Sequence, residues 1–244
     1  MAASGQVSLT DVLGLASTTA GLLALGYTAW RSAGRVWSRT VGSRRTVARQ
    51  LDGIACGVTL GYLQARLGSP AFRRPCFDLV ELTWRLPHVW FCGLVADDSL
   101  LAFAITVTDP RFGYDCRHLT FGLLPVRLGR DPLATAPDPV GTTVSIGARR
   151  FYVTDEHYFG NPGAYQRYLL AHNDQGVGSL VADTVSTDAV SLPAGPDLAE
   201  IARVRAGTTA NTLVVGGAHD DRAWRLWDFP GVDGDFVRTL RARD

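Results

Sequence analysis

The stretch FDLVELTWRLPHVWFCGLVADDSLLAFAITVT, residues 77 to 108, decides the fold class of this chain. It contains three runs rich in β-branched and aromatic residues, at 77–86, 89–95 and 100–108, and such runs are typical of β-strands. The mostly polar residues 96–99, Ala-Asp-Asp-Ser, separate the last two runs as a hairpin turn does. The sequence therefore predicts an antiparallel hairpin.

Two short helices are expected before these strands. In RRTVARQLDGI, residues 44–54, three apolar residues recur at helical spacing: Val47, Leu51 and Ile54. In GVTLGYLQARLGSP, residues 57–70, Thr59 is a candidate N-cap, and Gly68 followed by Pro70 is a stop signal. Short helices beside antiparallel strands predict a mixed α+β body.

Further strands are expected towards the C-terminus. The runs at 149–159 and 166–185 are predicted to form a second hairpin that turns at 173–176. A helix at 198–206 and a strand at 212–217 follow a polar stretch that contains proline and glycine.

An internal similarity in the body suggests a tandem repeat. GVTLGYLQARLG, residues 57–68, aligns with HLTFGLLPVRLG, residues 118–129, and they match at six positions: Thr59/Thr120, Gly61/Gly122, Leu63/Leu124, Arg66/Arg127, Leu67/Leu128 and Gly68/Gly129. Two repeats at 50–110 and 115–186 would then precede a C-terminal extension at 187–244. Pro125 is an objection, because proline breaks a helix interior, and the alternative is two loops that look alike by chance.

An uncharged run near the N-terminus predicts a membrane anchor. Residues 12–30 carry no charge, and a helix of these 19 residues would be about 28 Å long, close to the thickness of the hydrocarbon core. Residues 1–11 contain no arginine, whereas a cleavable signal peptide begins with a positive segment. The alternative is the first helix of a soluble core, since the run is poor in large apolar residues.

The residues after this run predict its orientation. Tryptophan and arginine side chains that suit the membrane boundary end the run and populate the basic juxtamembrane segment 31–49: Trp30, Arg31, Arg35, Trp37, Arg39, Arg44 and Arg45. Because basic residues stay on the cytoplasmic side, we expect a single-pass protein of the cell (inner) membrane. Its tail at 1–11 would lie outside and its body at 50–244 in the cytoplasm, with membrane lipid as one partner.

Parts of the chain resemble known families. Five residues match the helix-turn signature of the SmpA/OmlA-like repeat: Gly57, Thr59, Leu67, Gly68 and Pro70. Val58 stands where that signature has methionine. The resemblance spans residues 57–108 and implies helices packed on a small antiparallel sheet, as in the tandem β-lactamase-inhibitor-like proteins, with a role in binding or assembly. From residue 51 to the C-terminal GDFVRTLRARD, the chain also resembles an uncharacterised bacterial family of singly anchored proteins.

No catalytic, metal or cofactor signature is present in the sequence. Four cysteines lack the short spacings of zinc or redox pairs and are expected to be buried thiols: Cys56, Cys76, Cys92 and Cys116. The chain has neither a lysine for a P-loop nor a G-x-S-x-G elbow. Its formal net charge of +1 produces no field that would attract nucleic acid. We therefore expect no metal, no cofactor and no nucleic acid.

The histidines and paired carboxylates are expected to be structural. The five histidines are too scattered to form a ligand pair, and most are expected at the surface or half-buried. The pairs Asp97-Asp98 and Asp155-Glu156 are expected in turns and at strand edges, because neighbouring residues of a strand point to opposite faces.

Aromatic residues around an Asn-Pro-Gly turn are the expected partner surface: Tyr158, Phe159, Asn161, Tyr165 and Tyr168. The alternative is a hairpin that folds back on the core. The sequence thus predicts a membrane-tethered binding or scaffolding protein with a protein partner and no deep polar pocket. The alternative function is a small hydrolase that uses His219 with Asp220, or Cys116 with His118, and it requires such side chains to meet in one cleft.

Overall fold

The computed structural model describes residues 42–147, 150–161, 164–181, 198–217 and 231–241. The chain divides into two compact units, Met1–Thr46 and Val47–Asp244, and we call the second unit the body. The predicted membrane-spanning run at 12–30 lies outside the described residues. No helix in the described ranges combines the length and the apolar character that a membrane span requires.

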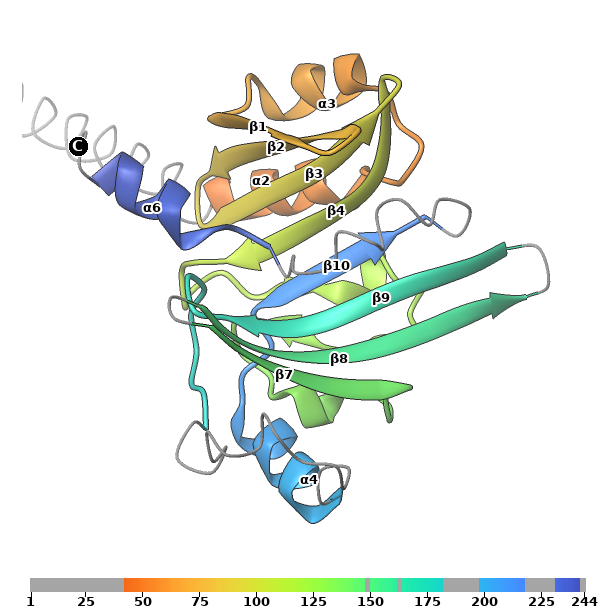
Figure 1. Cartoon of the computed structure of the whole chain (residues 1–244), viewed down its shortest axis with the longest axis vertical. Helices are drawn as coiled ribbons and strands as arrows, with labels where there is room; N and C mark the ends of the chain where they lie inside the picture. The colour runs from red at the N-terminus through yellow and green to blue at the C-terminus, as the bar shows by residue number, and fades with distance from the viewer. Residues whose placement is uncertain (1–41, 148–149, 162–163, 182–197, 218–230, 242–244) are drawn as a thin grey trace, which may run out of the picture. The chain divides into compact units, whose positions relative to one another are not determined.

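The body is built on one antiparallel sheet of eight strands, in the order β1-β2-β3-β4-β10-β9-β8-β7 (Figure 1). Its strands have the following bounds: β1 Phe72–Cys76, β2 Leu79–Leu86, β3 Val89–Ala96, β4 Ser99–Val107, β7 Gly141–Gly147, β8 Arg150–Asn161, β9 Ala164–Asn173 and β10 Thr212–Gly216. A separate pair, β5 Tyr114–Asp115 and β6 Arg127–Leu128, forms a small second sheet. The α+β class is confirmed.

The hairpin predicted from residues 77–108 is present as β3 and β4. Asp97 and Asp98 form its two-residue connection, with φ angles of 49° and 63°. Two consecutive left-handed residues suit the twist of a tight hairpin, and aspartate tolerates that conformation better than most residues. The expectation that this carboxylate pair occupies a turn is confirmed.

The second predicted hairpin has a different connection. The register pairs Asn161 with Ala164, so β8 and β9 are joined there and not at 173–176. Residues 173–176 do form a turn, in which the Gln175 amide donates to Asn173 Oδ1 at 2.7 Å, but this turn ends β9. A polar turn signal marks the end of a strand and does not say which strands it joins.

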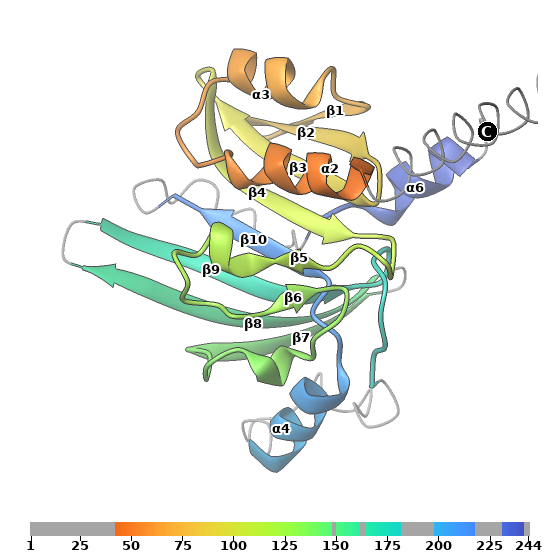
Figure 2. The ribbon, with the colours of Figure 1, turned by 180° about the vertical axis from the view of Figure 1, so that it is seen from behind.

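Helices flank the sheet as follows: α2 Ser43–Asp52, α3 Leu60–Leu67, α4 Leu198–Gly207 and α6 Gly234–Arg241. Two 3₁₀ turns, at Cys116–His118 and Leu133–Thr135, lie in the connection between β4 and β7. Residues of α2, α3 and this connection cover the face of the sheet that carries Phe91, Phe103 and Leu213, which we call the core face (Figure 2).

The opposite, outer face packs against the C-terminal segment. Val232 and Val237 contact a second cluster that includes Cys92. Arg74 of β1 joins the sheet to this segment, because its Nε donates to Glu81 Oε2 at 2.8 Å and its Nη1 donates to Asp233 Oδ2 at 3.0 Å. The two faces therefore have separate apolar layers.

The segments that suggested a tandem repeat differ in local structure. Residues 60–67 form α3, whereas residues 118–129 contain the end of a 3₁₀ turn and the short strand β6. The sheet itself has two sets of four strands, β1–β4 and β7–β10, whose last members β4 and β10 pair antiparallel at its centre. The similarity of the two sequence segments is thus not reflected in a repeated helix, which agrees with the objection from Pro125.

We expect the Thr59→Ala variant to be less stable than the wild-type body by about 1 kcal/mol. Thr59 Oγ1 accepts a hydrogen bond of 3.2 Å from the Tyr62 amide and so caps α3, as the sequence predicted. Urea unfolding of a truncated protein that begins at Gly42 measures the loss. The Thr59→Ser variant keeps the acceptor and should stay within a few tenths of a kcal/mol of the wild type. A Ser variant as unstable as the Ala variant would contradict the capping role.

Candidate functional site

The hairpin of β8 and β9 extends beyond both neighbouring strands. Pairing with β7 ends at Gly141–Glu156, and pairing with β10 ends at Gly216–Arg167. The pairing of β8 with β9 continues to Asn161–Ala164. The residues beyond these limits, 157–161 and 164–166, therefore form a two-stranded ribbon that projects from the sheet (Figure 1). We call these residues the ribbon.

Strand alternation divides the predicted partner surface between two faces. Tyr158 is 51% exposed, whereas Phe159 is half-buried and Tyr168 is only 1% exposed. The rings of Phe159 and Tyr168 lie 6.1 Å apart. The Tyr168 hydroxyl donates a hydrogen bond to Gln166 Oε1. The sequence had placed Tyr168 in the exposed partner surface. The structure corrects this, because Tyr168 is a core residue. Its side chain packs in the core-face cluster. Because successive residues of a strand point to opposite faces, Tyr158, which lies next to Phe159 on β8, is directed to the other face.

Other predicted residues are placed on the chain as follows. Asn161 and Tyr165 occupy the ribbon strands, opposite Ala164 and Gly160 respectively. Arg44 and Arg45 lie in the first turn of α2. The remaining membrane-flanking residues, Trp30, Arg31, Arg35, Trp37 and Arg39, fall outside the described residues, as does the His219-Asp220 pair.

A buried ion pair lies at the base of the ribbon. Asp155 of β8 is fully buried and accepts from Arg205 Nε of α4 at 2.7 Å and from Thr142 Oγ1 at 2.7 Å. Burial raises the pKa of Asp155, and the hydrogen bonds from Arg205 and Thr142 oppose that rise. Arg205 also donates to the Pro137 carbonyl at 3.2 Å. The expectation of an edge carboxylate at Asp155 is wrong, because α4 closes over this part of the core face.

His157 lies two residues further along the same face and is 1% exposed. Neither of its ring nitrogens has a hydrogen-bond partner among the described residues, and the ring stacks on Phe159 with centroids 6.0 Å apart. Burial, and to a smaller extent the nearby positive charge of Arg205, together lower the pKa of His157 to about 4, against a weaker opposing effect of Glu156. This histidine and His172, which is 5% exposed, are buried, whereas His88 is half-buried and His118 is exposed.

Among the described residues, the candidate hydrolase couple of Cys116 and His118 does not form a catalytic group. Cys116 is fully buried, and burial raises the pKa of its thiol well above the usual range. His118, its proposed partner, is exposed. The buried His172 is occupied elsewhere, because its Nδ1 lies 2.9 Å from the Thr209 carbonyl oxygen. A protonated buried thiol is a poor nucleophile. All four cysteines are free, as expected, although Cys56 and Cys76 are only half-buried.

A polar pocket of about 700 Å³ lies at the end of the sheet opposite the ribbon. Residues from β2, the β2–β3 turn, β3, the turn after β9 and α6 line it, and they include Arg85, His88, Trp90, Asp174, Gln175 and Arg238. The binding hypothesis predicted no deep polar pocket, and the presence of this polar pocket differs from that expectation. Cys116, His118 and His172 are not among its described lining residues.

His88 is held rigidly at this pocket. Its Nδ1 lies 2.7 Å from Asp109 Oδ2, and its ring stacks on Phe112 with centroids 5.8 Å apart. Its φ of 72° is unusual for a residue other than glycine. The pairing of Val89 with Val107 brings His88 and Asp109 together across the β3–β4 hairpin. A sequence search for local motifs misses this pair, but a search across the predicted hairpin would have found it.

Comparison with known proteins assigns no family. No family model matches the chain, and no curated protein matches it. One similar structure is an extracellular protein with an SCP domain from Bacillus anthracis str. Ames, with 8% identity and a TM-score of 0.31. The match covers 75% of this chain and 51% of the Bacillus protein, so this chain spans about half the length of that protein. A putative β-lactamase inhibitor protein from Streptococcus mutans has 12% identity and a TM-score of 0.22 over 50% of this chain and 80% of its own.

The second of these structures carries the name of the class to which residues 57–108 have a resemblance.

Proposed function

We propose that this protein is a membrane-tethered binding protein whose body docks a protein partner on the ribbon. The observation that carries the proposal is the projection of β8 and β9 past both neighbouring strands, with Tyr158 half-exposed on one face. Tyrosine offers a large amphipathic contact at a low cost in side-chain entropy, and it is enriched in protein interfaces. Extended strand backbone also offers hydrogen-bonding groups to a partner.

The base of the ribbon supports this role by being rigid. Phe159 and Tyr168 attach one face of the ribbon to the core, and the salt bridge between Arg167 Nε and Glu156 Oε1, at 2.6 Å, joins the two strands. A preordered surface loses less entropy on binding than a mobile one. The other face carries Tyr158, which is 51% exposed, and it is the face on which we place the partner.

The hydrolase alternative has less support. It would require a nucleophile, and the buried Cys116 thiol is held in its protonated form by desolvation. The described lining of the polar pocket includes Thr108 but no serine or cysteine. The uncharged run at 12–30 and the arginines after it support the tether, the cell-membrane location and the cytoplasmic body that we propose.

Photocrosslinking from position 158 tests this proposal. We expect Tyr158→p-benzoylphenylalanine in the full chain to give one discrete adduct in intact cells, because the side chain is at the proposed contact. Tyr62, which is 39% exposed on α3, is the matched control position and should give no such adduct.

A truncated protein that begins at Gly42 separates location from binding. It should appear in the soluble fraction and still form the adduct when mixed with membranes or lysate that contain the partner. Equal adducts from positions 158 and 62 would overturn the ribbon as the docking surface. A truncated protein that stays in carbonate-washed membranes would overturn the N-terminal tether.

A further inference from the structure

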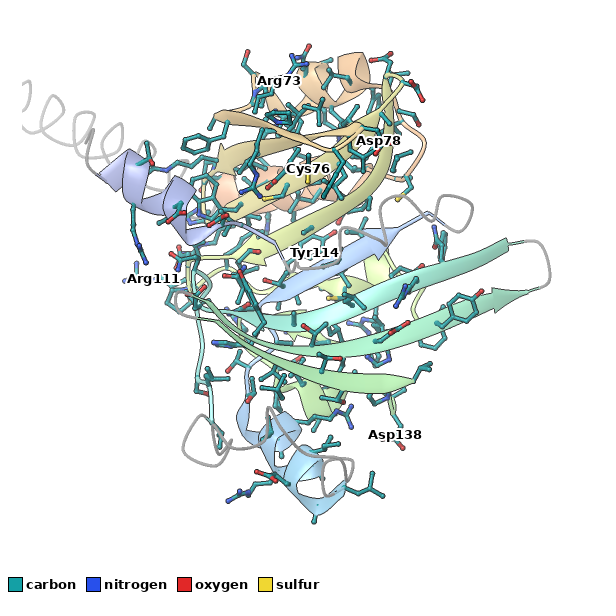
Figure 3. The ribbon with its side chains drawn as sticks, in the orientation of Figure 1. Arg73, Cys76, Asp78, Arg111, Tyr114 and Asp138 are labelled. Atoms are coloured by element: carbon teal, nitrogen blue, oxygen red, sulfur yellow. The ribbon has the colours of Figure 1, made fainter. Side chains whose placement is uncertain are left out.

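The two edges of the sheet differ in their protection against pairing. The β1 edge carries Arg73, Arg74 and Pro75, and charges and proline are the usual means of preventing an edge from joining another sheet. The β7 edge has the sequence GTTVSIG, without charge or proline. Figure 3 shows Arg73 at the β1 edge and Asp138, which precedes β7, towards the opposite edge. Only one edge is thus protected by its sequence.

The unprotected strand is regular, and its described side chains at 141–144 are exposed or half-buried. Each residue of β7 pairs with one residue of β8 in an unbroken register from Gly141–Glu156 to Gly147–Arg150. Thr143 is exposed, and Val140, just before the strand, is 74% exposed. Val144 packs against the core-face cluster. A regular strand attached firmly to its sheet presents its outer backbone groups in a fixed array, as strand addition requires.

The sequence of β7 is nearly symmetrical about Val144. If a second copy of the strand runs antiparallel with Val144 opposite Val144, then Thr143 lies opposite Ser145, Thr142 opposite Ile146 and Gly141 opposite Gly147. Hydroxyl residues meet hydroxyl residues, and β-branched residues meet β-branched residues, which are favourable cross-strand pairs. Because the side-chain period is two, this register also keeps the core faces of both copies on the same side.

We propose that β7 is a dimerisation edge, at which two copies of this chain pair antiparallel about a two-fold axis at Val144 and join their eight-stranded sheets into one. The occupant of the edge is a second copy because the strand is complementary to itself, and a two-fold interface uses the same patch on both subunits. In this dimer the two ribbons point in opposite directions, since the second sheet is rotated by half a turn.

A disulfide test reports the register directly. We expect full-length Val144→Cys, in detergent with a mild oxidant, to form a disulfide-linked dimer, because directly opposite Cα atoms lie about 4.5–5.5 Å apart and a disulfide spans that distance. Thr143→Cys should not link, because the two copies of position 143 lie diagonally, about 7–8 Å apart. Thr143→Cys with Ser145→Cys should link again. The wild-type chain measures any background from its own thiols.

A charge test needs no disulfide. Thr143→Lys places a charge on each side of the axis, and we expect at least a ten-fold weaker dimer by light scattering after size exclusion of the full chain. Thr239→Lys makes the same change at an exposed position on α6 and should leave the dimer intact. A wild-type chain that is monomeric, a dimer that resists Thr143→Lys, or a Val144→Cys chain that links only to another protein would overturn the proposal.

Discussion

The Arg205→Ala variant is expected to lose about 3–5 kcal/mol of folding stability. The loss is large because the substitution leaves Asp155, which is 0% exposed, without the guanidinium that donates to it at 2.7 Å. A buried carboxylate without its charged partner must either pay the desolvation cost or take up a proton. Arg205 also links α4 to the Pro137 carbonyl, so the same change weakens the attachment of α4. Urea unfolding of the protein that begins at Gly42 measures the effect.

Two further variants separate the ion pair from the helix. Arg203→Ala removes an exposed arginine from the same helix and should change stability by no more than about 0.5 kcal/mol. Arg205→Met combined with Asp155→Leu removes both charges, and we expect it to recover most of the loss. A single variant Arg205→Ala that unfolds within 1 kcal/mol of the wild type would show that the pair does not hold α4 to the sheet.

Acid is expected to destabilise the body through His157. The pKa of this histidine falls from 6.5 in the unfolded chain to about 4 in the folded body. The unfolded state therefore binds a proton first as pH decreases, so stability is complete above pH 6.5 and is lost progressively down to about pH 4. His157 costs the body about 3 kcal/mol of folding stability once the pH is well below 4. About 2 kcal/mol of this stability is already lost at pH 5.

The difference between wild type and His157→Phe isolates this group. Asp155 acts in the opposite sense, because its raised pKa adds stability as pH falls, so the wild-type profile alone mixes both groups. We expect His157→Phe to gain about 2 kcal/mol on the wild type when the pH is lowered from 7 to 5. Phe159→Leu removes a ring of the same stack but no histidine, and its deficit should be equal at both pH values. A constant difference between His157→Phe and wild type would contradict the lowered pKa.

Local sequence patterns predicted correctly those elements that a few neighbouring residues determine. The hairpin of β3 and β4, the cap at Thr59 and the helix that contains Val47 and Leu51 were all predicted, because a few neighbouring residues produce each of them. The strand β7 was not predicted. Only two of its seven residues, Val144 and Ile146, have apolar side chains, and it becomes a strand by pairing with β8. Strand formation of this kind depends on the partner more than on intrinsic propensity.

The candidate site illustrates the same limit. The sequence pointed to the aromatic residues around 158–168, but strand alternation and packing decide that Tyr158 is exposed while Tyr168 is buried. The ion pair between Asp155 and Arg205 spans 50 residues, and the pair between His88 and Asp109 spans a hairpin. No local motif contains such pairs, because they form only after the sheet is assembled and α4 is placed.

The sequence by itself determined the α+β class and the central hairpin, because periodicity and turn chemistry act over a few residues. Tertiary structure alone decided that the last strands of the two halves, β4 and β10, meet at the centre of one sheet, leaving β1 and β7 as edges and β8 and β9 as a ribbon. It also decided which charges are buried. The physical reason is that burial and strand order come from contacts between residues far apart in the chain, and the free energy of each such contact depends on the whole arrangement around it.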